Sequence, residues 1–162
     1  DYRSALLDLN TAIELNPKDI SAYEIRGGAK YELKDYNGAI DDMDKAIELS
    51  PNYALFYECR GKAKTDLGDF PRALIDLNKA LELNPNLVDA YEYRADVKFK
   101  IKNYQGAIQD LTKAIEFKPN YSINYNNRGC AKERTGDLTG ADLDFKTAEK
   151  LKGKALVKGF IR

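Results

Sequence analysis

Apolar and small residues recur along this chain at the spacing of one helix face, with charged residues between them. From residue 20 the pattern runs through Ala22, Tyr23, Gly27 and Leu33, which predicts an amphipathic helix of about 14 residues. A polar turn follows, and a second amphipathic run of similar length ends where Pro51 prevents the helix from continuing. The pattern therefore predicts helices in pairs.

The pattern repeats with a period of 34 residues. Four of the five prolines mark it, since each lies 34 positions after the one before: Pro17, Pro51, Pro85 and Pro119. A tyrosine, an arginine before a small residue, and two alanines seven positions apart return with the same period. A regular repeat of this length predicts a solenoid, in which each unit packs only against its neighbours.

The period divides the chain into one truncated repeat, four further repeats and a tail. Residues 1–19 match only the second helix of a repeat, so its first helix is expected upstream. The complete repeats occupy 20–53, 54–87 and 88–121, the degenerate last repeat occupies 122–155, and a short C-terminal tail occupies 156–162. We therefore predict nine helices, one without a partner followed by four antiparallel pairs.

Both ends of such a stack are expected to leave apolar side chains uncovered. These are Leu6, Leu9 and Ile13 at one end, and Leu156, Phe160 and Ile161 at the other. Monomeric proteins seldom tolerate large apolar patches. Self-association through the open repeat ends is therefore expected.

The aromatic, small, alanine and proline positions of the first complete repeat resemble the tetratricopeptide repeat, a helix-turn-helix of 34 residues. The matching residues are Tyr23, Gly27, Tyr36, Ala39, Met43, Ala46 and Pro51. The resemblance covers essentially the whole chain. It implies an all-α helical-repeat solenoid, a right-handed superhelix of antiparallel helix pairs. It also implies a scaffold, since members of the family bind many unrelated partners.

A glycine or alanine follows the recurring arginine in every first helix. Glycine inside a helix costs up to about 1 kcal/mol relative to alanine, so Gly27, Gly61 and Gly129 predict that another helix approaches closely there. We interpret the recurring tyrosines as the large side chains beside these glycines; the alternative is an aromatic platform for a ligand. An Asp or Asn in each turn is expected to cap the second helix.

The composition narrows the classes of function. Basic and acidic residues balance at 26 each and make up 32% of the chain, which gives no bulk attraction for nucleic acid or anionic lipid. No apolar run approaches the roughly 20 residues of a membrane span. We expect a soluble segment, with a cytoplasmic location favoured and any signal peptide upstream of Asp1.

Residues for catalysis or metal binding are sparse. There is no histidine, the commonest general base and metal ligand. The two cysteines, Cys59 and Cys130, lie two repeats apart and are expected to be reduced thiols. The aspartates recur with the repeat, which favours a structural role over acid–base chemistry. We predict a protein that is not an enzyme and holds no cofactor or metal.

In the family, the first helices line a concave groove. The resemblance places these residues in it: Glu24, Glu58, Cys59, Lys62, Glu92, Tyr93, Asp96, Asn126 and Asn127. Glutamate stands where one subclass carries the lysine of a clamp for C-terminal carboxylates, so that mode of binding is not expected. A row of carboxylates predicts a basic or neutral partner segment, with Tyr93 as an aromatic anchor and the asparagines bonding an extended backbone. The alternative is that the glutamates only solvate helix surfaces or pair with lysines.

Arginine and aspartate recur as strictly as the proline. The arginines precede the small residue of each first helix and the aspartates lie in the second helices: Arg26, Arg60, Arg94 and Arg128, with Asp8, Asp42, Asp76, Asp110 and Asp144. A lysine follows each arginine four positions later, on the same helix face. We predict a ladder in which each arginine bridges to an aspartate of its own or the preceding repeat. The alternative is a set of exposed pairs, each worth under about 1 kcal/mol.

The leading hypothesis is a scaffold whose groove holds a peptide segment of a partner protein. A structural spacer or self-association module of a larger protein is the alternative. RNA binding is disfavoured by the zero net charge and by glutamate rather than basic residues along the groove.

Overall fold

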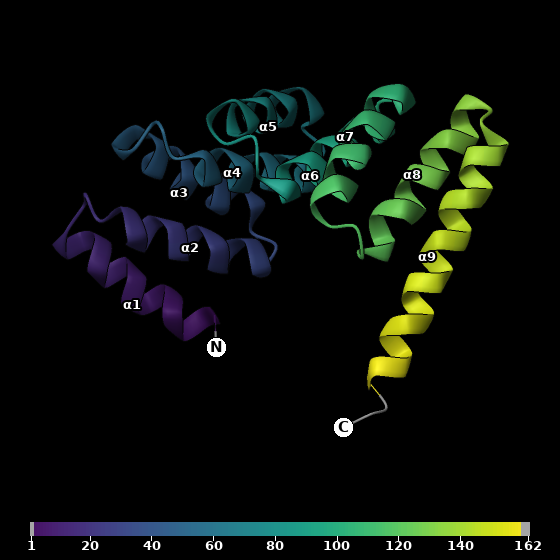
Figure 1. Cartoon of the computed structure of the whole chain (residues 1–162). Helices are drawn as coiled ribbons and strands as arrows, with labels where there is room; N and C mark the ends of the chain where they lie inside the picture. Colours follow the sequence, from purple (N-terminus) through teal and green to yellow (C-terminus); the bar gives the residue numbers. More distant parts are fainter. Residues whose placement is uncertain (1, 160–162) are drawn as a thin grey trace. The chain divides into compact units, whose positions relative to one another are not determined.

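The computed structural model describes the backbone of residues 2–159 and the side chains of residues 2–153. This part of the chain forms nine α-helices and no strand (Figure 1). The helices are α1 (Tyr2–Leu15), α2 (Ile20–Glu32), α3 (Tyr36–Leu49), α4 (Ala54–Leu67), α5 (Phe70–Leu83), α6 (Val88–Lys100), α7 (Tyr104–Phe117), α8 (Ser122–Thr135) and α9 (Leu138–Gly159). The predicted all-α fold and its nine helices are confirmed.

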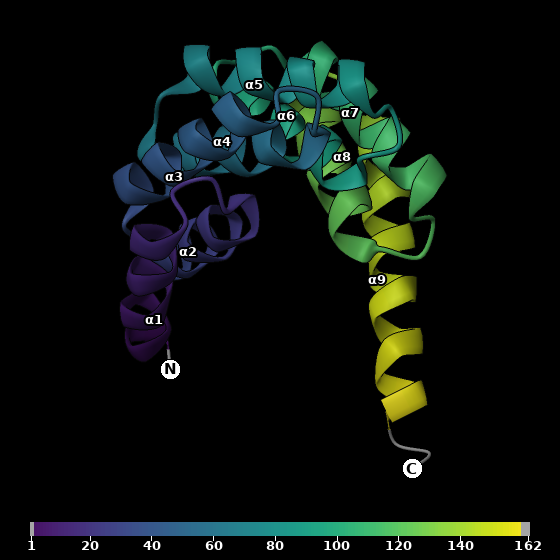
Figure 2. The same ribbon diagram turned by 90° about the vertical axis from the view of Figure 1, so that its left-hand side faces the viewer.

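The chain divides into two compact units. The N-terminal unit, Asp1–Ala90, contains α1 to α5 and the start of α6, and the C-terminal unit, Tyr91–Arg162, contains the rest of α6 and the helices that follow. In the N-terminal unit each of α1 to α4 packs on the helix that follows it. In the C-terminal unit α8 packs on α7 and on α9, and Figures 1 and 2 both show α8 and α9 side by side. The pairs α2–α3, α4–α5 and α8–α9 thus pack through their own two helices, and α3–α4 and α7–α8 join neighbouring pairs.

The turns inside the repeats are closed by the predicted caps. Each capping side chain accepts a hydrogen bond from the backbone N–H three residues later. The caps are Asp35, Asp69, Asn103 and Asp137. Two of these turns also contain a glycine in the left-handed region, Gly68 at φ 86° and Gly136 at φ 85°, where other residues would be strained.

The glycines of the first helices lie where the second helix approaches closely. A Cβ added at Gly27 would lie 2.6 Å from Met43 Cε, and one added at Gly61 would lie 2.8 Å from Leu77 Cγ. In the C-terminal unit a Cβ at Gly129 would lie 2.6 Å from Phe145 Cε1. The close approach predicted from the glycines is therefore present, although the side chains that fill the space come from the second helices and not from the recurring tyrosines.

Three of the recurring tyrosines attach their first helix to the turn before it. The hydroxyls of Tyr23, Tyr57 and Tyr125 donate to the carbonyl oxygens of the prolines six residues earlier, at 3.3, 2.9 and 3.0 Å. The arginine three positions after each of the four tyrosines places its guanidinium 5.5–5.6 Å from the ring centre, within reach of a cation–π interaction. These contacts favour a structural role over a ligand platform.

The prediction of an exposed apolar patch at the N-terminal end was wrong. Leu6, Leu9 and Ile13 of α1 are half-buried, and Ile13 packs against the core cluster of the N-terminal unit. This face of α1 is turned inwards, so the helix exposes Leu7 (69%) and Leu15 (82%) instead.

At the other end, α9 is longer than the pattern predicts. It has 22 residues, so residues 156–159, which we assigned to a tail, are helical. The predicted apolar patch of Leu156, Phe160 and Ile161 lies outside the side chains that the structure describes.

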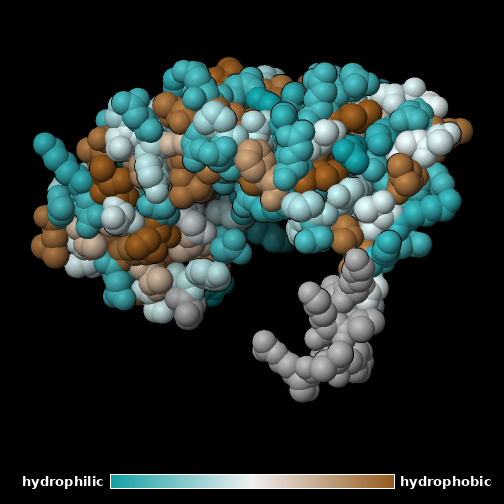
Figure 3. Space-filling view, in the orientation of Figure 1, coloured by the Kyte–Doolittle hydropathy of each residue, from teal (hydrophilic) through white to brown (hydrophobic). Residues whose placement is uncertain are grey.

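The surface mixes polar and apolar side chains. Figure 3 shows apolar patches interspersed with hydrophilic ones on the face in view. Scattered apolar side chains of this kind are ordinary on protein surfaces. None of the helices in the described part of the chain combines the length and the apolar character needed to cross a bilayer.

Candidate functional site

In each of the four helix pairs, an arginine and a lysine of the first helix bind one aspartate of the second helix. The N–O distances lie between 2.5 and 2.8 Å. We call these groups the repeat triads: Arg26, Lys30 and Asp42; Arg60, Lys64 and Asp76; Arg94, Lys98 and Asp110; Arg128, Lys132 and Asp144. The aspartate side chains are only 2–4% exposed, so these are not the exposed pairs of the alternative interpretation.

Arginines of the triads also reach back to the preceding repeat. Arg60 Nη1 lies 2.6 Å from Asp44 Oδ1. At the same position of two other repeats the acceptor is uncharged: Arg26 Nη1 donates to Asn10 Oδ1 at 2.8 Å, and Arg128 Nη1 donates to Thr112 Oγ1 at 3.1 Å. We infer that the triads fix the register between repeats, most strongly at Arg60, where the acceptor carries a charge.

The pKa directions within the triads follow their geometry. Burial alone would lower the pKa of Arg60, but the hydrogen bonds to Asp76 and Asp44 outweigh it, and the pKa is raised above its ordinary value. For Asp144, burial would raise the pKa, but the hydrogen bonds from Arg128 and Lys132 outweigh it and lower the pKa. Both shifts favour the charged forms of Arg60 and Asp144.

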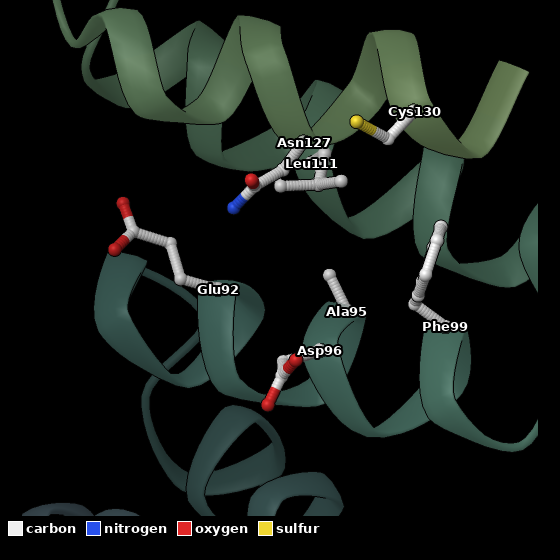
Figure 4. A pocket seen from close by; sticks show the side chains of 7 residues that line it. All are labelled: Glu92, Ala95, Asp96, Phe99, Leu111, Asn127 and Cys130. Carbon is white, nitrogen blue, oxygen red and sulfur yellow. The ribbon is translucent and has the colours of Figure 1, made fainter. Parts of the chain in front are cut away.

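A cavity of about 240 Å³ opens in the C-terminal unit (Figure 4). Its walls are Glu92, Ala95, Asp96 and Phe99 of α6, Leu111 of α7, and Asn127 and Cys130 of α8. The carboxylates of Glu92 and Asp96, one helical turn apart, thus lie at the edge of a space whose other walls include an aromatic ring, an aliphatic side chain and a thiol. Such a mixture of apolar walls and a few polar groups is typical of a binding pocket.

Nearby groups partly balance the two carboxylates of this cavity. Glu92 Oε1 accepts a hydrogen bond from Asn124 Nδ2 at 2.8 Å and lies 3.8 Å from Lys118 Nζ. The Asp96 carboxylate lies 2.9 Å from Lys100 Nζ, and both of those side chains are more than 40% exposed, so water screens this pair. The Asp96 carboxylate therefore stays accessible to a further cation.

A smaller cavity of about 120 Å³ lies in the N-terminal unit. Its walls are Glu24, Gly27, Gly28, Tyr31 and Glu32 of α2, Ala39 and Met43 of α3, and Cys59 and Lys62 of α4. The Lys62 ammonium lies 4.0 Å from the centre of the Tyr31 ring, a cation–π contact. The Tyr31 hydroxyl donates a hydrogen bond to a carboxylate oxygen of Asp66, and this bond holds the hydroxyl end of the ring in place.

Cys59 in this smaller cavity is a weak acid. Burial raises the pKa of its thiol to about 11, with smaller contributions from the nearby carboxylates of Glu58 and Glu24. The thiol is therefore protonated and unreactive at neutral pH.

A third hollow in the N-terminal unit is wider, about 580 Å³, and lies between α1 and α2. It is lined by Tyr2, Ala5, Ile25, Gly28, Ala29 and Glu32. One carboxylate and no other charged group line it, so it offers less specific recognition than the two cavities.

The cavities bring together six of the nine residues that the resemblance placed in a groove. Glu24, Cys59 and Lys62 line the smaller one, and Glu92, Asp96 and Asn127 line the larger one. The other three line neither: Glu58 is only 7% exposed, Tyr93 is half-buried and Asn126 is exposed. Glu58 is therefore not the open groove carboxylate that we expected, because the repeat fixes a residue's angular position on the helix but not how deeply it is covered.

Sequence reasoning missed the apolar walls. Tyr31 and Phe99 lie four positions after Gly27 and Ala95, one turn along the same face, and Met43 and Leu111 form the opposite wall. An aromatic residue at this position occurs in only two of the four repeats, where the others carry Thr65 and Glu133. The sequence signal for these walls was therefore an aromatic residue that does not recur in every repeat.

Known structures share the fold. A crystal structure of MamA superposes with a TM-score of 0.91 over 96% of this chain and 91% of that chain, at 24% sequence identity. YrrB, described as a TPR protein with an unusual peptide-binding site, has a TM-score of 0.80 over 94% of this chain and 78% of that chain, at 20% identity. The TPR domain of Arabidopsis OM64 has a TM-score of 0.69 over 70% of this chain and 94% of that chain, at 24% identity. The predicted helical-repeat solenoid is confirmed.

The sequence comparisons give the family. A search of the curated proteins finds no significant match. The family model of the ETO1 C-terminal domain matches residues 26–155, which is most of the chain and includes all four repeat triads. The chain is a tetratricopeptide-repeat protein and belongs to the ETO1 C-terminal domain family.

Proposed function

We propose that this chain is a protein-interaction module whose first helices bind a peptide segment of a partner protein. The observation that carries the proposal is the pair of cavities. Each opens between two neighbouring first helices and combines apolar walls with carboxylate, amide or ammonium groups. The fold neighbour YrrB, described as a TPR protein with an unusual peptide-binding site, supports the same use of this fold. The module binds and carries out no chemical step.

The charges of the cavities favour a basic or neutral segment. Glu24 and Glu92 stand where the carboxylate clamp of the family needs a lysine, and the larger cavity adds Asp96. A concave surface with carboxylates on it focuses negative potential and attracts cations. An acidic segment or a C-terminal carboxylate would meet repulsion there.

The proposal is tested with the purified chain on an array of immobilised peptides of basic, neutral and acidic composition. We expect retention of basic and neutral peptides that weakens as salt is raised, since salt screens charge attraction. Glu92→Gln should reduce this retention. Glu116→Gln is the matched control, because Glu116 lies on α7, pairs with Lys113 and is exposed.

Three outcomes contradict the proposal. Retention of no peptide favours the structural spacer or self-association module. Preferential retention of acidic peptides reverses the assigned charge. Equal losses in Glu92→Gln and Glu116→Gln place binding away from the cavity.

A further inference from the structure

The two cavities are the same site seen two repeats apart. Every residue that lines the larger cavity lies 68 positions after one that lines the smaller cavity. A carboxylate is common to both (Glu24 and Glu92), and so is an aromatic wall (Tyr31 and Phe99). Each side chain of the larger cavity therefore has a defined counterpart in the smaller one.

In the N-terminal unit, the chain itself supplies a lysine to this site. Lys62 of α4 lines the cavity, and its ammonium lies 4.0 Å from the centre of the Tyr31 ring. Glu24 and Glu32 are on the same walls. Such a cavity suits a lysine side chain, because its aliphatic part packs against apolar walls and its ammonium lies on an aromatic face.

In the C-terminal unit, the position of Lys62 is taken by Cys130, which is shorter and carries no ammonium. The cavity is correspondingly larger, about 240 Å³ against about 120 Å³. At the position of Gly28 this unit has Asp96, which adds a carboxylate to the wall. Two carboxylates line each cavity, Glu24 and Glu32 in the smaller and Glu92 and Asp96 in the larger, since Lys100 stands at the position of Glu32. The larger cavity thus keeps two carboxylates and an aromatic wall, and it has space where the lysine of the other unit lies.

The cations already near the larger cavity do not occupy that place. Lys100 pairs with Asp96, Lys118 lies 3.8 Å from Glu92, and the Arg134 guanidinium lies 6.0 Å from the centre of the Phe99 ring. None of the three belongs to the walls of the cavity. Arg134 lies farther from the Phe99 ring than Lys62 lies from the Tyr31 ring.

We propose that the C-terminal cavity binds a lysine side chain of the partner peptide, in the place that Lys62 occupies in the N-terminal unit. The inference rests on the proposed peptide-binding function. The stem lies along Phe99, Leu111 and Ala95, and the ammonium is held by the ring face and by Asp96 and Glu92. Cys130 forms the floor of the site.

The probe is a blocked pentapeptide with one lysine between alanines, compared with versions that carry norleucine, arginine or glutamate instead. Amide chemical shifts of the labelled chain are followed while each probe is added at millimolar concentration. We expect the lysine probe to shift the amides of residues 92–99 and 127–130 and to leave those of residues 24–31 and 59–62 unchanged. Alkylation of Cys130 should slow when the probe is bound, while Cys59, whose pKa is raised to about 11, serves as the thiol that stays unreactive.

Exchange of side chains between the units sharpens the test. Cys130→Lys should fill the larger cavity and abolish the shifts, and Lys62→Cys should open the smaller cavity so that residues 24–31 begin to respond. Asp96→Asn, at an exposed position, should weaken binding of the lysine probe several-fold. Glu116→Gln should leave it unchanged.

The outcomes separate this inference from the proposed function. Equal shifts with norleucine or glutamate, or stronger shifts with arginine, overturn the lysine site. So does a Cys130→Lys variant that folds and still responds. If the array retains basic peptides while the lysine probe shifts no cavity amide, the inference fails and the peptide-binding function stands. If the array retains nothing and the probe shifts nothing, both fail.

Discussion

The first helices have two faces that differ in how strictly the repeat constrains them. The face toward the second helix carries the same arginine and lysine in all four repeats, and both bind a buried aspartate. On the face that lines the cavities, one position carries Gly28, Lys62, Asp96 and Cys130 in turn. Uniform side chains build the scaffold because every repeat requires the same packing. Side chains that change from repeat to repeat can give each unit its own binding surface.

The largest effect should come from removing a triad aspartate. Asp76→Ala leaves the cations of Arg60 and Lys64 without their buried counter-ion, which should lower the free energy of unfolding by about 3 to 5 kcal/mol. Asp8 is the matched control, since it occupies the same position of the repeat in α1 but is exposed. Asp8→Ala should cost under about 0.5 kcal/mol in urea unfolding. Similar losses of unfolding free energy in the two variants would show that the triads do not stabilise the fold.

Replacing a triad arginine should cost less, because the lysine remains on the aspartate. Arg60→Met removes charged hydrogen bonds to Asp76 and Asp44 and should lower stability by about 2 kcal/mol. Lys79→Met breaks only an exposed pair with Glu82 and should cost under about 0.5 kcal/mol. Urea unfolding of both variants measures the difference, and a near-neutral Arg60→Met would mean that Lys64 alone satisfies the aspartate.

Two glycines one position apart in the repeat should respond with opposite signs. A methyl at Gly61 would lie 2.8 Å from Leu77 Cγ, so Gly61→Ala should destabilise by about 1 to 2 kcal/mol through overpacking. A methyl at Gly28 would meet nothing within 4 Å, so Gly28→Ala should stabilise the helix by about 0.5 to 1 kcal/mol. Thermal unfolding separates them, and the same sign for both would contradict the contrast between a packed face and an open one.

The smallest effect should be a pH dependence at Asp144. Hydrogen bonds from Arg128 and Lys132 outweigh burial and lower the pKa of this carboxyl, so the folded state favours its ionised form. This stabilisation is fully present above the unfolded pKa of about 3.9 and is lost as pH falls below it. The deficit in unfolding free energy of Asp144→Asn relative to the parent should therefore narrow below about pH 4. Urea unfolding of both proteins across that pH range measures this deficit. A deficit that does not change with pH would show that the charge of Asp144 contributes nothing to stability.

The helix pairs, their caps and the arginine–aspartate contacts could be predicted from the sequence because the repeat fixes their positions. Arginine at one position of the first helix and aspartate at one position of the second recur together, and a 34-residue period places them opposite each other in every unit. The lysine of each triad was noted on the same face as the arginine, but its bond to the same aspartate was not predicted. The cap residues followed from turn chemistry in the same way.

The binding surface could be predicted only in part, because it depends on departures from the repeat. Tyr31 and Phe99 were missed since the other repeats carry no aromatic residue at their position. Glu58 shares the position of Glu24 and Glu92 but is buried, and depth of burial depends on side chains that the period does not specify. Lys62 and Cys130 occupy the same position of two different repeats, and this difference points to a binding site only when the two cavities are compared.

The central claim is that the variable face of the first helices binds the partner. Its most direct test is the set of amide chemical shift changes when a basic peptide retained on the array is added to the labelled chain. The account predicts changes concentrated at residues 92–99 and 127–130, around the larger cavity, with little change near the exposed lysine–glutamate pairs of the second helices, such as Lys79 and Glu82. Changes concentrated on those second-helix surfaces, with the cavity amides unmoved, would contradict it.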